Sequence, residues 1–184
     1  MRVVAGTARG HPLVAPAGDA TRPTPDRVRE AVFNVLYSLG GVVGANVVDL
    51  YAGTGAMGIE ALSRGADHAS FVETSPEALA ALRENLRTVG LEDRAEIVSR
   101  DVGSFLRASS TWFDLAIIDP PYAFDDWSEL LPEVSAGLVV IESGRDIDLP
   151  SGWETHRVKR YGGTVVTVTS PHRSGADNAG SASS

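Results

Sequence analysis

The 184-residue chain contains no cysteine. This absence excludes a disulfide scaffold, a thiolate zinc site, an iron–sulfur cluster and a cysteine nucleophile. Long apolar runs are also missing: none approaches the roughly 18 residues of a membrane span, and the first twenty residues hold no signal-like block. We therefore expect a soluble, cytoplasmic protein with one domain, large enough to stabilise its core without a metal.

Positive charge is scarce, with 16 Lys and Arg against 24 Asp and Glu and a net charge of −8. This balance argues against non-specific coating of nucleic acid. The charge is unevenly distributed, because residues 1–30 carry five arginines and three acids, and the remaining 154 residues sum to −10. The sequence therefore predicts a local basic face on an acidic body.

The chain divides into three parts. Residues 1–22 are punctuated by Gly and Pro and are predicted to form a basic N-terminal arm that could fold as a β-hairpin. Residues 23–170 alternate short apolar runs with helix-like stretches and are predicted to form a single domain. Residues 171–184 show no apolar period and are predicted to be a disordered tail.

Short strands alternate with helices along the central part. A helix capped by Thr24 should begin at Pro25 and end at Gly40-Gly41. Further helices are expected over 55–64 and 75–90, with strands over 46–50, 68–74, 95–100, 113–119 and 138–142 and a hairpin of 153–160 with 164–169. This alternation predicts a three-layer α/β sandwich with a mostly parallel sheet and an antiparallel C-terminal hairpin, which binds ligands at the carboxyl ends of its strands.

The first predicted strand is followed by a G-x-G-x-x-G pattern made of Gly53, Gly55 and Gly58. Such glycines allow a tight turn and a close approach of a ligand to the backbone, although a Gly-rich turn that binds nothing shows the same pattern. Glu73 ends the second strand and could accept hydrogen bonds from ribose hydroxyls, or simply precede the next helix. Asp101 follows the third strand. It could accept a hydrogen bond from an adenine amino group, or it could serve as the N-cap of a helix.

These features fit a nicotinamide dinucleotide or S-adenosylmethionine. Asp49 precedes the glycines, where a carboxylate would repel a pyrophosphate but could bind a cationic aminoacyl group. The fourth strand ends in Asp119-Pro120-Pro121-Tyr122. Both observations favour S-adenosylmethionine.

Two consecutive prolines fix φ, remove two N–H donors and hold the preceding residues extended. The Asp119 carboxylate and the Pro120 carbonyl can therefore accept both hydrogens of an exocyclic amine and localise its lone pair toward an electrophilic methyl group. Tyr122 can stack on the base, a contact worth about 1–3 kcal/mol. A purely conformational turn is the alternative; its place after a strand next to the Gly-rich turn favours the catalytic interpretation.

Together, several segments resemble the bacterial 16S rRNA guanine-N2 methyltransferases, the RsmD-like family: Arg22-Pro23-Thr24, Asp26–Glu30, 49–55, 60–66, 71–73 and 119–122. The resemblance implies a class I methyltransferase fold with a seven-stranded sheet. It also implies S-adenosylmethionine as donor, S-adenosylhomocysteine as product and one guanine in a small-subunit rRNA hairpin loop as substrate. No metal is expected. The substrate could be free rRNA, an assembly intermediate or the assembled small ribosomal subunit, and the protein is expected to be a monomer.

The resemblance also assigns residues. The cofactor would be held by Asp49, Ala52, Gly53, Thr54, Gly55, Glu73, Thr74, Asp101 and Val102, and the base by Asp119, Pro120, Pro121 and Tyr122. The basic charge of the arm and the first helix, rather than the resemblance, predicts that RNA contacts Arg2, Arg9, Arg22, Thr24, Arg27 and Arg29, although Arg27 could equally pair within its own helix. The sequence departs from the family at Gly10-His11-Pro12, where the arm is less basic, and at Thr74-Ser75, where an acid is frequent.

Three alternatives use the same residues. DNA adenine-N6 methyltransferases normally carry a separate target-recognition region to read base edges, whereas no spare segment here exceeds about 20 residues, and this favours a structured RNA loop. A protein glutamine or amine methyltransferase and a non-enzymatic nucleotide-binding module are the others. The remaining large aromatic residues are expected in the core, namely Trp112, Phe113, Trp127 and Trp153.

Overall fold

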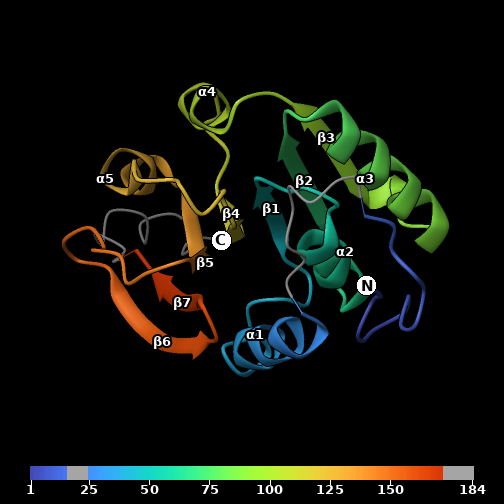
Figure 1. Ribbon diagram of the computed structural model, residues 1–184, viewed down its shortest axis with the longest axis horizontal. Helices are drawn as coiled ribbons and strands as arrows, with labels where there is room; N and C mark the ends of the chain where they lie inside the picture. Colours follow the sequence, from blue (N-terminus) through green and yellow to red (C-terminus); the bar gives the residue numbers. More distant parts are fainter. Residues whose placement is uncertain (16–24, 172–184) are drawn as a thin grey trace, which may run out of the picture.

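The computed structural model describes residues 1–15 and 25–171, in which a twisted sheet lies between two layers of helices (Figure 1). The sheet has seven strands in the order β3-β2-β1-β4-β5-β7-β6. Their bounds are β1 Asn46–Leu50, β2 His68–Glu73, β3 Ala95–Ser99, β4 Phe113–Ile118, β5 Ala136–Ser143, β6 Glu154–Tyr161 and β7 Thr164–Ser170. β1 to β5 pair in parallel, and β7 runs antiparallel to both β5 and β6. The predicted sheet and its C-terminal hairpin are confirmed.

Helices cover both faces of the sheet. They are α1 Asp26–Ser38, α2 Ala56–Ser63, α3 Pro76–Val89, α4 Val102–Ala108 and α5 Trp127–Leu130, with 3₁₀ turns η1 Glu92–Arg94 and η2 Leu131–Glu133. Figure 1 shows α1, α2 and α3 on one side of the sheet and α4 and α5 on the other. The core is accordingly divided in two, one cluster on each face.

Strand alternation sends successive side chains to opposite faces. In β1, Val47 packs toward α1 and α2 while Val48 packs toward the α4 and α5 side. In β4, Ile117 and Ile118 divide in the same way. Because both faces are covered, apolar residues follow one another directly in these strands, at Val47 and Val48 of β1 and in the continuous apolar run 115–118 of β4.

Local signals set the helix ends. The Ser75 side chain accepts from the Ala78 N–H, Pro76 occupies the first turn, and Gly90 ends α3 with a φ of 66°. Helix α1 begins at Asp26 rather than Pro25, because Pro25 has an extended backbone and occupies the cap position. Thr24, the predicted cap, lies outside the described residues.

Residues 1–15 form a turn that folds back on itself through one antiparallel bridge between Arg2 and Pro12. The Val3 N–H donates to the His11 carbonyl and the Gly10 N–H to the Val3 carbonyl, at 3.0 and 2.9 Å. The rest of the predicted arm, and nearly all of the predicted C-terminal tail, lie outside the described residues. Within 1–15 and 25–171, no helix has the length and apolar character needed to cross a membrane.

Candidate active site

The turn after β1 is the centre of the candidate site. Gly53 and Gly55 have φ values of 54° and 77°, which L side chains rarely adopt, and Tyr51 has a φ of 61° although it carries a side chain. A non-glycine residue in this region is strained, and such strain is typical of functional turns. The turn is therefore held in one conformation by its surroundings.

The three glycines have different roles. A Cβ on Gly55 would lie 2.2 Å from Leu82 Cδ1, and one on Gly58 would lie 2.3 Å from Phe71 Cε1. These two glycines let α2 pack closely against β2 and α3. A Cβ on Gly53 would approach no atom closer than 4.0 Å, so Gly53 alone borders open space where a ligand could lie.

Glu73 connects the turn after β1 to the turn after β2. Its Oε2 accepts from the Gly53 N–H at 2.8 Å, and its Oε1 accepts from the N–H groups of Thr74 and Ser75 at 2.7 and 2.8 Å. A carboxylate has about four acceptor positions, so Oε2 retains room for a further donor. The predicted contact of the half-buried Glu73 with a ribose hydroxyl is therefore compatible with these three hydrogen bonds.

Asp101 and Val102 stand at the start of α4, after β3. The exposed Asp101 caps the helix, because its Oδ1 accepts from the Ser104 N–H at 2.9 Å. The cap uses one acceptor position of the carboxylate, so the adenine contact and the cap are compatible. Val102 is buried and fixes the start of the helix.

Asp49 lies beneath the turn, in β1. Its side chain is buried, and its Oδ2 accepts from the Gly58 N–H at 2.8 Å. Burial raises the pKa of Asp49 to about 8, and the negative charges of Glu73 and Glu142 contribute in the same direction. A cation bound near Asp49 would lower this pKa and favour the carboxylate, which suits a site for a positively charged ligand.

Asp119 to Tyr122 follow β4, the strand next to β1. The Asp119 N–H donates to the Leu50 carbonyl at 3.4 Å, which holds the two turns side by side. Burial, followed by the charges of Glu142 and Asp49, raises the pKa of Asp119 well above its usual value. Pro120 is buried, Pro121 is exposed, and the structure brings all four residues to the same edge of the sheet as Gly53.

The Tyr122 side chain contacts two neighbouring residues and is still largely exposed. A Cβ on Gly144 would lie 2.9 Å from Tyr122 Cδ1, and the Tyr122 hydroxyl is 3.0 Å from Thr164 Oγ1. The residue is nevertheless 59% exposed. An aromatic ring that is held by neighbouring residues and still largely exposed is a suitable platform for stacking a base.

The sequence analysis assigned no role to three residues near the site: Tyr51, Phe124 and Glu142. Tyr51 and Phe124 place their ring centroids 5.7 Å apart, and Phe124 meets Trp127 edge-on at 4.9 Å, so aromatic contacts join the turns after β1 and β4. Glu142 is 5% exposed and lies in β5 beside Asp119. A charged residue at the end of an otherwise apolar strand was the available signal for Glu142.

The cofactor turn is also tied to the N-terminal arm. Asn85 of α3 is buried; its amide donates to the carbonyls of Thr54 and Val14 at 2.9 and 3.0 Å. The Asn85 side-chain oxygen accepts from the Val14 N–H at 2.7 Å. Ala52 is buried and donates its N–H to the Val72 carbonyl. The arm, the turn after β1 and α3 therefore form one connected structure.

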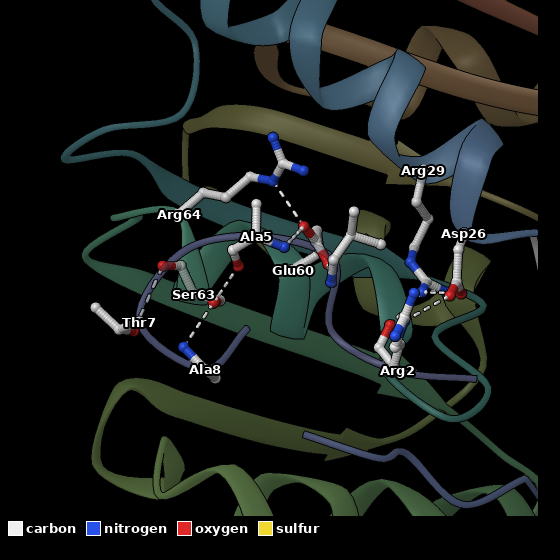
Figure 2. A network of polar contacts seen from close by, with 10 residues as sticks. Arg2, Ala5, Thr7, Ala8, Asp26, Arg29, Glu60, Ser63 and Arg64 are labelled. Carbon is white, nitrogen blue, oxygen red and sulfur yellow. Dashed lines mark hydrogen bonds and ion pairs between the residues drawn. The ribbon is translucent and has the colours of Figure 1, made fainter. Parts of the chain in front are cut away.

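Figure 2 shows how the arm is fixed to α2. The fully buried Glu60 carboxylate accepts from the N–H groups of Val4 and Ala5 at 2.8 and 3.0 Å and from Arg64 Nε at 2.7 Å. The Ser63 hydroxyl donates to the Ala5 carbonyl and accepts from the Ala8 N–H. The first fifteen residues are thus part of the folded body rather than a loose extension.

The predicted RNA contacts separate into exposed and buried residues. Arg9 and Arg27 are exposed, and Arg2 is exposed while pairing with Asp26 at 3.4 Å. Arg29 is fully buried and donates to Asp26 Oδ1 at 2.8 Å and to the Arg2 carbonyl (Figure 2). The prediction that Arg29 contacts RNA is therefore wrong for the folded protein, since its guanidinium fastens the arm to α1. Arg22 and Thr24 lie outside the described residues.

Of the aromatic residues expected in the core, Phe113 and Trp127 are buried and Trp153 is half-buried. Trp112 is 44% exposed, so its prediction is wrong. It immediately precedes β4, outside the alternation that buries Phe113.

Over the part of the chain that the structure describes, no group of His, Asp and Glu side chains is arranged to hold a metal ion.

The strand order, the Gly-rich turn after β1 and the acidic Pro-Pro-Tyr turn after β4 define a class I methyltransferase. The candidate methyltransferase YhhF of Escherichia coli superposes with a TM-score of 0.83 at 31% identity, covering 94% of this chain and 98% of that one.

The chain belongs to the family described as conserved hypothetical protein 95, the RsmD family, whose model matches residues 1–170. It is 37% identical to YlbH, a candidate rRNA methyltransferase of Bacillus subtilis, over 91% of this chain and 97% of that protein. It is 34% identical to ribosomal RNA small subunit methyltransferase D of Escherichia coli strain K12, over 88% of this chain and 85% of that protein. The resemblance predicted from the motifs is confirmed.

Proposed function

We propose that this protein transfers a methyl group from S-adenosylmethionine to the N2 amino group of one guanine in 16S rRNA of the small ribosomal subunit. The observation that carries the proposal is the position of the Asp119–Tyr122 turn: the Asp119 backbone N–H donates to the Leu50 carbonyl, which holds this turn beside the open turn at Gly53. The names of the two relatives support an rRNA substrate.

The cofactor would lie along the turns after β1, β2 and β3. Residues 52–55 would bound it, the Glu73 carboxylate would accept from its ribose, and Asp101 and Val102 would face its adenine, with Thr74 flanking Glu73. Asp49 would offset its positive charge from beneath the turn. When bound, S-adenosylmethionine supplies an electrophilic methyl carbon and leaves as S-adenosylhomocysteine.

The chain's own residues prepare the base. The lone pair of an exocyclic amine is delocalised into the ring, which makes the amine a poor nucleophile. Asp119 and the Pro120 carbonyl would accept its two hydrogens and direct the lone pair away from the ring, while Tyr122 stacks on the base. The methylated nitrogen is a strong acid and releases a proton, so no strong general base is required.

RNA would approach over the arm. Arg2, Arg9 and Arg27 are exposed there, and Arg22 and Thr24 belong to the same predicted surface. Asn85 joins the arm at Val14 to Thr54 of the cofactor turn, so RNA held on the arm would lie next to the site. We further propose that the protein acts as a cytoplasmic monomer, on the small subunit or its assembly intermediate.

The test uses small ribosomal subunits and free 16S rRNA from cells that lack the gene, incubated with purified protein and methyl-labelled S-adenosylmethionine. Digestion to nucleosides should place the label in N2-methylguanosine. Label in N6-methyladenosine, or only in a ribosomal protein, would contradict the proposal and favour one of the two alternative methyltransferase activities. The same assay with Asp119→Ala controls for contaminating enzymes.

A further inference from the structure

Glu142 is a buried carboxylate that the proposed chemistry does not yet use. It lies near the end of β5 and is 5% exposed. The ladder between β4 and β5 pairs Ile118 with Ile141, so the next residues, Asp119 and Glu142, stand side by side at the carboxyl end of the sheet. Two adjacent carboxylates therefore border the place proposed for the base.

The position of Glu142 points to the base rather than to the cofactor. The sheet order places β2 and β1, with Glu73 and Gly53, on one side of β4, and places β5 on the other. Glu142 and Ser143 line a small cavity together with Pro120, Pro121 and Tyr122. The Tyr122 ring packs against Gly144, two residues after Glu142. The wall opposite the cofactor turn is thus built from the end of β5.

Like charges are costly to bury next to each other, unless a ligand brings hydrogen-bond donors or positive charge to them. The charge of Glu142 raises the pKa of both Asp119 and Asp49, so the three carboxyl groups lie close enough to interact electrostatically. A ligand with several adjacent N–H donors and no facing acceptor would relieve this repulsion.

Guanine has such an edge. Its N1–H and its 2-amino group are neighbouring donors, whereas adenine and cytosine present a ring-nitrogen acceptor beside their amino group. If the 2-amino group lies at Asp119, the N1–H next to it lies toward the neighbouring strand. This argument rests on the proposed guanine-N2 activity and extends it.

We propose that Glu142 is a specificity-determining residue that accepts the N1–H of the target guanine while Asp119 accepts from the 2-amino group. A base with an acceptor at N1 would direct its lone pair at the Glu142 carboxylate. Glu142 would thereby select guanine at a site whose Asp-Pro-Pro-Tyr turn alone receives any exocyclic amine.

The decisive substrate is 2-aminopurine, which keeps the 2-amino group and lacks the N1–H. Small-subunit rRNA is ligated from fragments that carry guanine or 2-aminopurine at the mapped methylation site, and kcat/KM is measured for each. A hydrogen bond to a charged group contributes enough that the wild type should prefer guanine by about 10- to 100-fold. In Glu142→Gln the ratio of kcat/KM for guanine to that for 2-aminopurine should fall to within about threefold. The variant should methylate guanine more slowly than the wild type does, whereas its rate with 2-aminopurine should be unchanged.

Two controls keep the result interpretable. The exposed Glu133→Gln should keep the full preference. The affinity for S-adenosylmethionine, measured by calorimetry, should be unchanged within about threefold in Glu142→Gln. Glu142→Asp serves as a second variant, which keeps the negative charge and moves it by one methylene. Equal loss on both bases in Glu142→Gln, or no preference in the wild type, would overturn the assignment of Glu142 while leaving guanine methylation standing. No transfer to guanine by the wild type would overturn the proposed function as well.

Discussion

Under the proposed function single side chains carry the chemistry, and three of them are acids that lie close together at the carboxyl end of the sheet. Asp49 and Glu142 are 2% and 5% exposed, and Asp119 is half-buried. Burying like charges lowers stability, and groups with strongly shifted pKa values concentrate at functional sites. Under the proposed function the cluster would serve two ligands, a cationic cofactor on the β1 side and an N–H-rich base on the β4 and β5 side.

Asp119→Ala should separate activity from stability. Loss of this acceptor should lower kcat for methyl transfer by about 100- to 1000-fold, the range found when one preorganised polar group is removed from an active site. The free energy of unfolding should change by less than about 1 kcal/mol or increase, since the repulsion with Glu142 and Asp49 is removed. Urea unfolding and single-turnover kinetics measure the two effects.

A loss of activity that accompanies a large loss of stability would instead assign Asp119 a structural role. Retention of wild-type turnover on rRNA would remove it from the catalytic machinery altogether.

Asp49 should make stability depend on pH. Its pKa rises from 3.8 to about 8 in the folded protein, so the folded state keeps a proton that the unfolded chain has lost between these values. The free energy of unfolding should therefore fall as the pH rises through this window and level off above it. Asp49→Asn should flatten the slope, because asparagine has no titratable carboxyl group. The fold should be kept, since the Asn side-chain oxygen can still accept from the Gly58 N–H.

The measurement is urea unfolding at pH 5, 6, 7 and 8, where the residual slope of Asp49→Asn reports the remaining groups, chiefly Asp119, whose pKa is also raised by burial. The exposed Asp93→Asn is the matched control and should follow the wild type. Parallel curves for Asp49→Asn and the wild type would show that Asp49 titrates normally.

The sequence was sufficient for residues whose role follows from their place after a strand. Asp119, Glu73 and Gly53 all lie where the alternating pattern predicted, because the carboxyl ends of parallel strands share one edge. Tertiary partners decided the others. Arg29 is buried by the arm, Gly55 serves packing against Leu82, and neither contact can be inferred from local pattern.

Among the elements, the N-terminal arm shows what its sequence did not reveal. A Gly- and Pro-punctuated basic segment predicted an arm that could fold as a β-hairpin and contact RNA, and residues 1–15 fold back on themselves and pack on α2 and α1 (Figure 2). Gly6 shows how close the contact is, because a Cβ there would lie 1.8 Å from the Ser63 carbonyl oxygen. The arm therefore presents its exposed arginines from a fixed position.

Glu60→Ala should release this arm. The substitution removes the acceptor of the Val4 and Ala5 N–H groups and the partner of Arg64. Loss of one side of a buried charge pair costs about 3–5 kcal/mol, so the urea midpoint should fall markedly and the amides of Val4 and Ala5 should exchange rapidly. Hydrogen exchange and urea unfolding are the measurements.

Glu84→Ala is the matched control on α3, where an exposed ion pair with Arg87 should contribute less than about 1 kcal/mol. Equal destabilisation by Glu60→Ala and Glu84→Ala would show that the arm is not held by Glu60.

Helices with clear end signals and apolar strands were predictable, whereas only the candidate N-cap at Asp101 marked α4 and nothing marked α5. α3 has a Ser cap, a Pro in its first turn and a Gly stop, so its limits follow from the sequence. α4 and α5 have seven and four residues, too few to establish a helical period. They form because the sheet face at Val72, Ile118 and Ile141 needs an apolar cover.

The molecule as a whole is acidic and still has to bind RNA under the proposed function. Few exposed arginines on the arm and α1 can contact phosphate, since Arg29 is buried. The slope of log K against log salt for 16S rRNA binding should therefore be only about −2 to −4. Arg9→Gln should reduce its magnitude by about 1, whereas Arg157→Gln on β6 should leave it unchanged. A slope near −10 would require a far larger basic surface.

The central claim is that the acidic turn after β4 holds a guanine for methylation next to the cofactor turn after β1. The most direct measurement is mass spectrometry of nucleosides from small-subunit rRNA in cells that lack the gene, complemented with the wild type or with Asp119→Ala. We predict that N2-methylguanosine at one site is lost without the gene, returns with the wild type and stays absent with the variant. Unchanged N2-methylguanosine across all three strains, or loss of a different modified nucleoside, would contradict the account.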